Sequence, residues 1–248
     1  MNPISFQLYS ARNFQPFSTV MEMLARLGYR QIEAYGAAYS DVAAMKADMA
    51  RTGLTMPTAH FALTALEQDL SGTLAIARTL GVGTIVIPYL MPADRPTDAA
   101  GWRDFGKRLE AVAQACSLHG FPVAWHNHDF EFVALPGGEI PQALIFEAAP
   151  SLLWEIDVAW VVRGGADPIA WIQREKKRIT AVHFKDIAPA GEAKDEDGWA
   201  DVGHGVIDWP PIVAALAGTP AKTFIVEHDN PKDVERFARR SIEALSKF

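Results

Sequence analysis

The sequence has very little cysteine: Cys116 is the single one, so no intramolecular disulfide can form. A free thiol is typical of proteins from a reducing compartment, and we therefore expect a cytoplasmic protein. Cys116 lies in a helical pattern of apolar residues, where it is expected to act as a small buried side chain.

Long apolar runs are also missing. No stretch of the chain approaches 18 consecutive apolar residues, and residues 1–6 have no basic residue ahead of an apolar segment. The sequence therefore predicts neither a signal peptide nor a membrane-spanning helix.

Positive charge is in deficit, with 23 Lys and Arg against 30 Asp and Glu, which gives a formal net charge of −7. Proteins that bind the nucleic acid backbone need a basic surface, so we expect no nucleic acid partner. A small anionic group could still be held by a few local cations. Arg12 and Arg163 are candidates, and surface ion pairs are the alternative role for both.

A Gly-x-Gly-x-x-Gly turn after the first strand is absent too, which argues against a dinucleotide-binding sheet. Instead a unit of helix, glycine and short apolar strand repeats along the chain, as at Gly28, Gly53 and Gly81. The pattern predicts eight strands, and we expect residues 1–248 to form one domain, a single (β/α)8 TIM barrel. The expected strands lie near residues 4–9, 31–35, 56–60, 84–88, 122–127, 153–157, 180–185 and 223–228.

Four of these strands end in side chains that can bind metals: His126, Asp157, His183 and Glu227. The carboxyl ends of parallel barrel strands meet at one mouth, so these groups are expected to converge there. Mixed imidazole and carboxylate ligands suit Mn, Co, Zn or Fe better than Ca. The sequence therefore predicts a site for one divalent cation.

Histidines gather at the same end of the predicted barrel. Six of the seven lie at strand ends or in the loops that follow: His60, His126, His128, His183, His204 and His228. Alternation of side chains places Glu155 on the same face as Asp157 but deeper, as a buried polar residue tied to a neighbouring strand. Asn127 is expected to hydrogen-bond a metal ligand.

The chain resembles the sugar-phosphate isomerase/epimerase group of xylose isomerase-like TIM barrels. The resemblance covers essentially the whole chain, and its most specific pieces are His-x-Lys-Asp at residues 183–186 and Gly-x-Gly-x-x-Asp-Trp at residues 203–209. Further matching pieces are residues 6–10, 28–33, 59–60, 125–132, 155–157 with Trp160, and 226–228.

The resemblance implies one divalent metal ion (Mn, Co, Zn, Mg or Fe) held by residues of strands five to eight. Carried over by position, the ligands are His126, Asp157, His183 and Glu227, and His126 departs from the family's usual glutamate. The resemblance implies that the family's epimerases use two metal-bound carboxylates, one on each face of the substrate. Either His126 or His128 replaces the missing one here, or the reaction is different. A homo-oligomer is a further expectation from the resemblance.

Several side chains near the site have candidate roles. Glu227 is the candidate base, and His60, His128 or Lys185 would return a proton. For Lys185 the alternatives are a lowered pKa beside the cation, an ion pair with Asp186 or the substrate, or a salt bridge to Glu155 or Asp157. The substrate-binding candidates are Glu33, which could instead orient a histidine or be solvated, and Tyr9, Trp160 and His204.

These residues predict an isomerase or epimerase that acts on a keto-sugar or related polyol through a metal-stabilised enediolate. Two alternatives stay open: a dehydratase or lyase that expels a β-hydroxyl from a keto-inositol or keto-sugar, and a sugar-binding barrel without catalysis. A DNA-repair endonuclease is disfavoured by the acidic charge of the chain.

Overall fold

The computed structural model describes residues 3–247, in which eight parallel strands form a ring. Hydrogen bonding joins them in the order β2-β1-β10-β7-β6-β5-β4-β3. The strands are β1 (Ile4–Gln7), β2 (Gln31–Glu33), β3 (Thr58–His60), β4 (Thr84–Ile87), β5 (Val123–His126), β6 (Leu153–Asp157), β7 (Ile179–Phe184) and β10 (Thr223–Val226).

The seam between β2 and β3 is held by isolated bridges rather than a regular ladder. The backbone N–H of Ile32 donates to Thr55 over 2.9 Å, and that of His60 donates to Ala34 over 2.8 Å. Pro57 precedes β3 and has no N–H to extend the ladder. The strands thus form a nearly closed barrel, and the predicted single (β/α)8 TIM barrel is confirmed.

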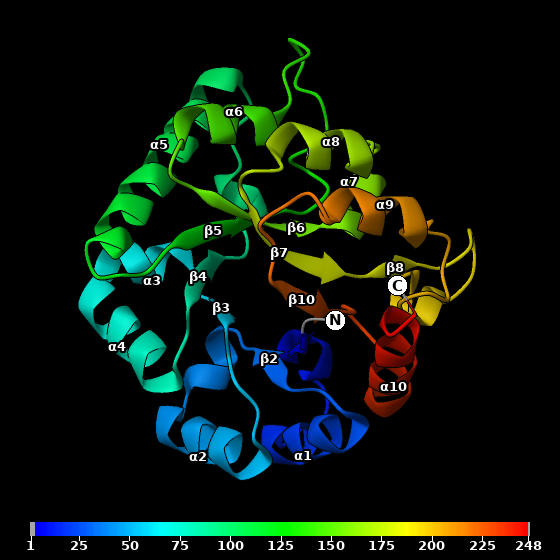
Figure 1. The fold of residues 1–248 in the computed structure, drawn as a ribbon. Coiled ribbons are helices and arrows are strands. Elements are labelled where there is room, and N and C mark those ends of the chain that lie inside the picture. Colours follow the sequence, from blue (N-terminus) through cyan, green and yellow to red (C-terminus); the bar gives the residue numbers. More distant parts are fainter. Residues whose placement is uncertain (1–2, 248) are drawn as a thin grey trace.

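Helices surround the ring of strands (Figure 1). Glycine ends three of them as predicted, and at Gly28 the backbone has a φ of 100°, which a residue without Cβ adopts at little cost. Among residues 3–247, no helix combines the length and apolarity that crossing a bilayer requires. The helices are α1 (Phe17–Leu27), α2 (Val42–Thr52), α3 (Leu63–Gln68), α4 (Leu70–Leu80), α5 (Ala99–Ser117), α6 (Pro141–Ala148), α7 (Val158–Arg163), α8 (Pro168–Glu175), α9 (Trp209–Leu216) and α10 (Val234–Leu245).

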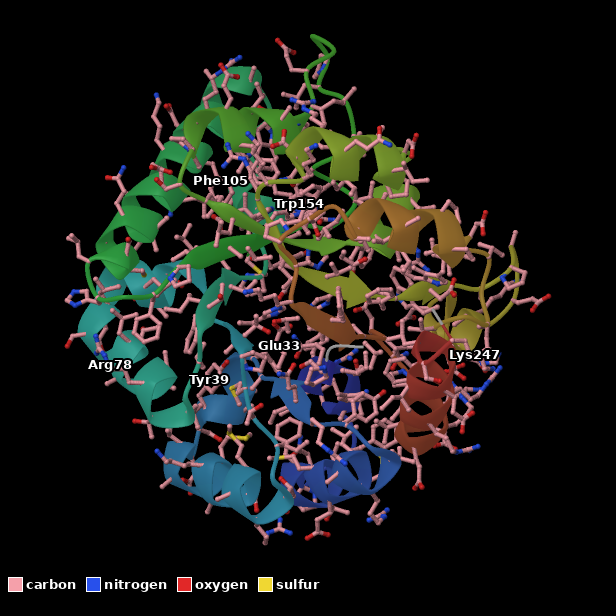
Figure 2. All side chains as sticks on the ribbon, in the orientation of Figure 1. Glu33, Tyr39, Arg78, Phe105, Trp154 and Lys247 are labelled. Atoms are coloured by element: carbon pink, nitrogen blue, oxygen red, sulfur yellow. The ribbon has the colours of Figure 1, made fainter. Side chains whose placement is uncertain are left out.

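The apolar core lies between the strands and the helices. The Trp125 ring of β5 packs on Phe105 of α5 with centroids 5.4 Å apart, and Phe6 of β1 packs on Tyr29 at 5.6 Å. The interior of the barrel at the carboxyl ends of the strands is polar instead, and Figure 2 shows Glu33 near the centre of the barrel. Because residues alternate along each strand, the same strands supply both the core and the site.

The long segment after β7 folds back onto the barrel. Its base is a two-stranded antiparallel sheet of β8 (Asp186–Ile187) and β9 (Trp199–Ala200), with Trp199 almost fully buried. The sequence of residues 189–205 is long and polar, which is typical of a mobile lid or a solvated excursion. The pairing of β8 with β9 instead joins the two ends of residues 188–198, here called the arm.

The buried carboxylate of Asp186 binds the chain that follows this arm. Its Oδ2 accepts hydrogen bonds from Gly203 N at 2.9 Å and Trp209 Nε1 at 3.1 Å, and its Oδ1 accepts from Ile207 N at 3.2 Å. A Cβ at Gly205 would lie 2.2 Å from Oδ1, so only glycine fits there. The His-x-Lys-Asp piece at residues 183–186 and the Gly-x-Gly-x-x-Asp-Trp piece at residues 203–209 are therefore joined by one set of hydrogen bonds.

We expect Asp186→Ala to lower the free energy of unfolding by about 3 kcal/mol, since it leaves several N–H donors without an acceptor. Urea denaturation of the variant measures this. The control is Asp208→Ala, which removes an exposed carboxylate that caps no N–H of α9 and should change stability by less than about 0.5 kcal/mol. Equal stability of Asp186→Ala and the unmodified protein would contradict the role given to this contact.

Candidate active site

A cavity of about 600 Å³ opens at the carboxyl ends of the barrel strands. Imidazole and carboxylate groups lie at its floor, and aromatic rings and two arginines form its walls. The lining residues are Tyr9, Arg12, Tyr35, Gly36, His60, Ala62, Pro88, Tyr89, Arg95, His126, His128, Asp129, Phe130, Trp160, Asp197, Glu227 and Asp229.

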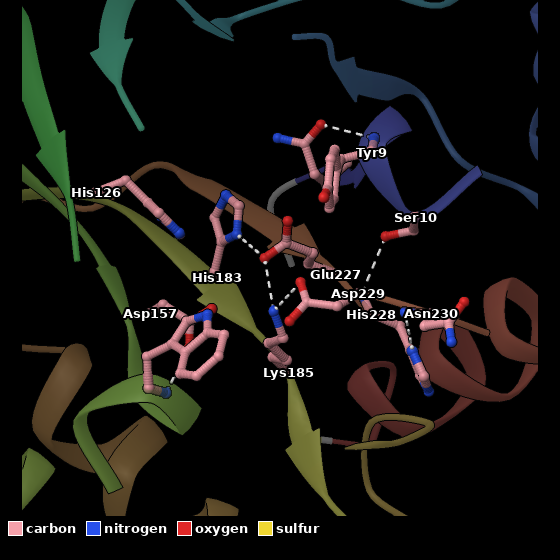
Figure 3. A network of polar contacts seen from close by, with 12 residues as sticks. Tyr9, Ser10, His126, Asp157, His183, Lys185, Glu227, His228, Asp229 and Asn230 are labelled. Carbon is pink, nitrogen blue, oxygen red and sulfur yellow. Dashed lines mark hydrogen bonds and ion pairs between the residues drawn. The ribbon is translucent and has the colours of Figure 1, made fainter. Parts of the chain in front are cut away.

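Four potential metal ligands converge at the floor. One ligand atom each of His126, Asp157, His183 and Glu227 lies within 4.8 Å of all the others, and all four side chains are buried. They come from the ends of β5, β6 and β7 and from the residue after β10 (Figure 3). The structure therefore brings together the four residues that the sequence nominated as metal ligands, here called the outer set.

Two atoms of the outer set are buried without a hydrogen-bond partner: Asp157 Oδ2 and His126 Nδ1. The other oxygen of Asp157 accepts from Trp160 N at 2.9 Å and caps α7. Burial is the main factor that raises the pKa of Asp157 to about 7, and the Glu227 carboxylate adds to it. Such atoms need a partner, and a cation would supply one, so the residues present fit a divalent metal ion.

Asn127 fixes the end of β6. Its Oδ1 accepts from Asp157 N at 3.0 Å and from Trp154 Nε1 at 2.9 Å, while its Nδ2 donates to Asp157 O at 3.1 Å. The expected contact with a metal ligand is thus made to the ligand's backbone, which sets where the Asp157 carboxylate points.

The His183 ring lies between carboxylates on both sides. Its Nε2 is 2.8 Å from Glu33 Oε1 and 3.0 Å from Glu155 Oε1, and its Nδ1 is 3.0 Å from Glu227 Oε2. Burial opposes protonation, but these carboxylates outweigh it and raise the pKa of His183 well above its usual value. With the proton on Nε2, the Nδ1 lone pair faces the outer set.

Below the outer set, Gln7, Glu33, His60 and Glu155 form a second buried group, here called the inner cluster. Gln7 Nε2 donates to Glu33 Oε1 over 2.8 Å, and His60 Nε2 lies 2.8 Å from Glu155 Oε1 and 3.0 Å from Glu33 Oε1. Burial opposes the imidazolium, yet the two carboxylates raise the pKa of His60 to about 10. Glu33 therefore orients histidines and is not solvated, and Glu155 is tied to neighbouring strands as expected.

The ammonium of Lys185 is fully buried in a cage. It lies 2.5 Å from Asp229 Oδ1 and 3.3 Å from Glu227 Oε2, and over the rings of Trp160 and Trp199 at 4.9 and 4.4 Å. Burial alone would favour the neutral amine, but Asp229 and Glu227 raise the pKa of Lys185 above its usual range. In the structure the ammonium is therefore paired with Asp229 and Glu227, and not with the expected Asp157, Glu155 or Asp186.

The chain matches a family model described as xylose isomerase-like TIM barrel over residues 21–248. The chain belongs to this family. A search of curated proteins finds no match.

Solved structures with the same fold include several such barrels. A sugar phosphate isomerase/epimerase from Parabacteroides distasonis has a TM-score of 0.82 at 19% identity, with 98% of this chain and 93% of that chain covered. The probable 3-DHS dehydratase AsbF from Bacillus anthracis gives 0.76 at 16%, with 98% of each covered. The IolI protein with a bound zinc atom gives 0.79 at 15%, with 100% and 97% covered. At these identities the likeness concerns the fold.

In this xylose isomerase-like barrel, the other nominated residues separate into two groups. Tyr9, Trp160, His60 and His128 line the cavity, whereas His204 is exposed on a turn and is not among the described residues that line it. Neither candidate for anion binding forms an ion pair among residues 3–247: Arg12 lines the cavity above Tyr9, and Arg163 stacks 3.2 Å from the Trp199 ring centroid.

Two residues that complete the site were not nominated from the sequence. Asp229 contacts Lys185, and Trp199 returns from the arm to cover it. Asp229 could have been found from the sequence, because it lies two positions after Glu227 and therefore faces the same side. Trp199 could not, because its position depends on how the segment after β7 folds.

We expect Lys185→Met to destabilise the protein by about 3 kcal/mol at neutral pH, because two buried carboxylates lose their counter-ion. Burial already raises the pKa of Asp229, and it should rise further without the ammonium. A carboxyl group whose pKa is raised by folding binds its proton more tightly in the folded protein, so folding gains stability as the pH falls. The deficit should therefore shrink between pH 8 and pH 5 in urea denaturation; a constant deficit would contradict this.

Proposed function

We propose that this protein is a divalent-metal-dependent isomerase or epimerase of a keto-sugar or related polyol. The observation that carries the proposal is the outer set, which gathers two imidazoles and two carboxylates at the floor of a sugar-sized cavity. Two of its atoms are buried and unpartnered. When bound there, a divalent cation would polarise a substrate carbonyl and acidify the neighbouring C–H.

The charges of the outer set suit a divalent ion. Asp157 and Glu227 contribute two negative charges, and His126 and His183 contribute neutral nitrogens, so a divalent cation is neutralised. The Lys185 ammonium lies closer to Asp229 than to Glu227, and its contact with Glu227 uses Oε2, so we assign Oε1 of Glu227 as the ligand atom. A histidine at position 126 in place of the family's usual glutamate therefore does not prevent binding.

Two residues have the geometry for proton transfer. Glu227 lines the cavity and is both a member of the outer set and the candidate base. His128 lines it too, and its Nδ1 is buried without a partner. Because His126 belongs to the outer set, we assign to His128 the second face of the substrate, where relatives use a carboxylate. Lys185 and His60 are tied to carboxylates, and we assign them to charge balance.

The cavity walls favour a sugar-like substrate. The aromatic residues Tyr9, Tyr89, Phe130 and Trp160 line the cavity. Aromatic faces pack against the C–H groups of a sugar ring, while the polar floor binds its oxygens. Parabacteroides distasonis proteins of this fold, named for sugar phosphate isomerisation, are consistent with this class.

Elimination is the second candidate. It starts with removal of the same α-proton and then expels a β-hydroxyl, so it needs one base rather than a carboxylate on each face. The presence of His126 where relatives have glutamate leaves Glu227 as the one cavity-facing carboxylate of the outer set and favours this option.

We expect about one divalent ion per chain by elemental analysis of protein purified without chelators. Incubation with a panel of keto-sugars and keto-inositols in D2O should give deuterium at the carbon beside the carbonyl, read by NMR. Asp157→Asn should reduce this exchange by at least about 100-fold. Exchange with intact substrate indicates isomerisation, and loss of water indicates elimination. Full exchange in Asp157→Asn or in chelator-treated protein would refute the proposal.

His128→Gln should keep the metal content and lower the exchange rate about 100-fold, because it removes a proton-transfer group and no ligand. The effect should fall on kcat rather than on KM. The matched control is His204→Gln, an exposed imidazole that should leave both constants unchanged. A His128→Gln protein that loses its metal would instead place His128 among the ligands.

A further inference from the structure

The inner cluster and His183 form a closed quadrilateral of alternating nitrogen and oxygen atoms. Its corners are His60 Nε2, Glu155 Oε1, His183 Nε2 and Glu33 Oε1, and its four edges measure 2.8, 3.0, 2.8 and 3.0 Å. Each edge is within hydrogen-bonding distance, so the four atoms form one closed ring of contacts around a common centre.

Further buried atoms support a bound cation near the centre of this ring. Glu33 Oε2 and Glu155 Oε2 are buried without a hydrogen-bond partner, as is His126 Nδ1, which lies 3.4 Å from Glu155 Oε1. The ligand atoms of His60, His126, Glu155 and His183 also lie within 4.8 Å of one another. The two fully buried carboxylates need two positive charges, which either the protonated rings of His60 and His183 or one divalent cation can supply.

We propose that the barrel has a second, inner position for the divalent cation, held by His60, His126, Glu155 and His183 beneath the outer set, with the Glu33 carboxylate beside it. This inference rests on the proposed function in that it concerns the same ion. His126 and His183 belong to the ligand groups of both positions, so one ion occupies either the outer or the inner position.

The His183 ring makes this exchange chemically balanced. With the cation at the outer position, Nδ1 binds it and the Nε2 proton is donated to Glu33 or Glu155. With the cation at the inner position, Nε2 binds it and the Nδ1 proton is donated to Glu227, whose Oε2 lies 3.0 Å away. The His183 ring keeps one proton in both states, and His60, which lines the cavity, releases its Nε2 proton to solvent when that nitrogen binds the ion. His60 and His126 line the cavity, which gives the ion a path to the inner position.

The test separates the two positions by their carboxylates. Asp157→Asn/Glu227→Gln removes those of the outer set, and adding Glu155→Gln removes one from the inner position. Each protein is stripped with a chelator, loaded with Co²⁺, and examined by elemental analysis and visible absorption. The double variant should retain about one cobalt per chain with an altered spectrum and a dissociation constant raised about 10- to 100-fold. The triple variant should bind none.

Other outcomes distinguish the two proposals. A folded double variant without cobalt overturns the inner position and leaves the outer one intact. A double variant with the spectrum and affinity of the unmodified protein keeps the inner position and overturns the proposed function. Cobalt retained by the triple variant overturns the inner position. Asp201→Asn controls for destabilisation, because it weakens the ion pairs of buried Asp201 with the partly exposed Arg236 and Arg240, away from the cavity.

Anomalous diffraction from crystals of the unmodified protein soaked in Co²⁺ keeps the test decisive if the variants do not fold. A peak among Glu33, His60 and Glu155 supports the inner position. A peak confined to Asp157 and Glu227 overturns it.

Discussion

The His183 imidazole between three carboxylates is the interaction on which the site depends. Glu33 and Glu155 face its Nε2 and Glu227 faces its Nδ1, each within 3.0 Å. One ring thus joins strands β2, β6 and β7 and the end of β10 across the barrel. A TIM-barrel interior is usually filled by branched apolar side chains. Here that packing is replaced by charge, which must be balanced by protons or by metal.

The surrounding structure maintains this balance at two further points. The Lys185 ammonium neutralises Asp229 beside Glu227, and the rings of Trp160 and Trp199 keep water from it. Lys185 directly follows β7, the strand that supplies His183. The same stretch of chain therefore positions both the central imidazole and the buried ammonium. Asp186, the next residue, fixes the segment that carries Trp199. His183 and Lys185 therefore balance the buried carboxylates directly, and Asp186 contributes by fixing the segment that covers Lys185.

The sequence predicted what depends on local pattern. The repeat of helix, glycine and strand predicted the barrel, and strand ends predicted that His126, Asp157, His183 and Glu227 meet. It could not predict pairings across the barrel, since Glu33 and His183 are 150 positions apart and their contact depends on the register of every strand between them. His204 was nominated because it follows a strand end as five other histidines do, but the sequence could not show that the loop carrying it leaves the side chain exposed.

The same electrostatics explain why histidine is tolerated at position 126. A glutamate there would add a third negative charge to the outer set, close to the Glu155 oxygen that already faces His60 and His183. The imidazole avoids that repulsion and still offers a nitrogen to a cation. The buried Glu33 and Glu155 of the inner cluster therefore favour an imidazole over a carboxylate at position 126. In a relative with glutamate at this strand end, we expect the position of Glu155 to be neutral or cationic.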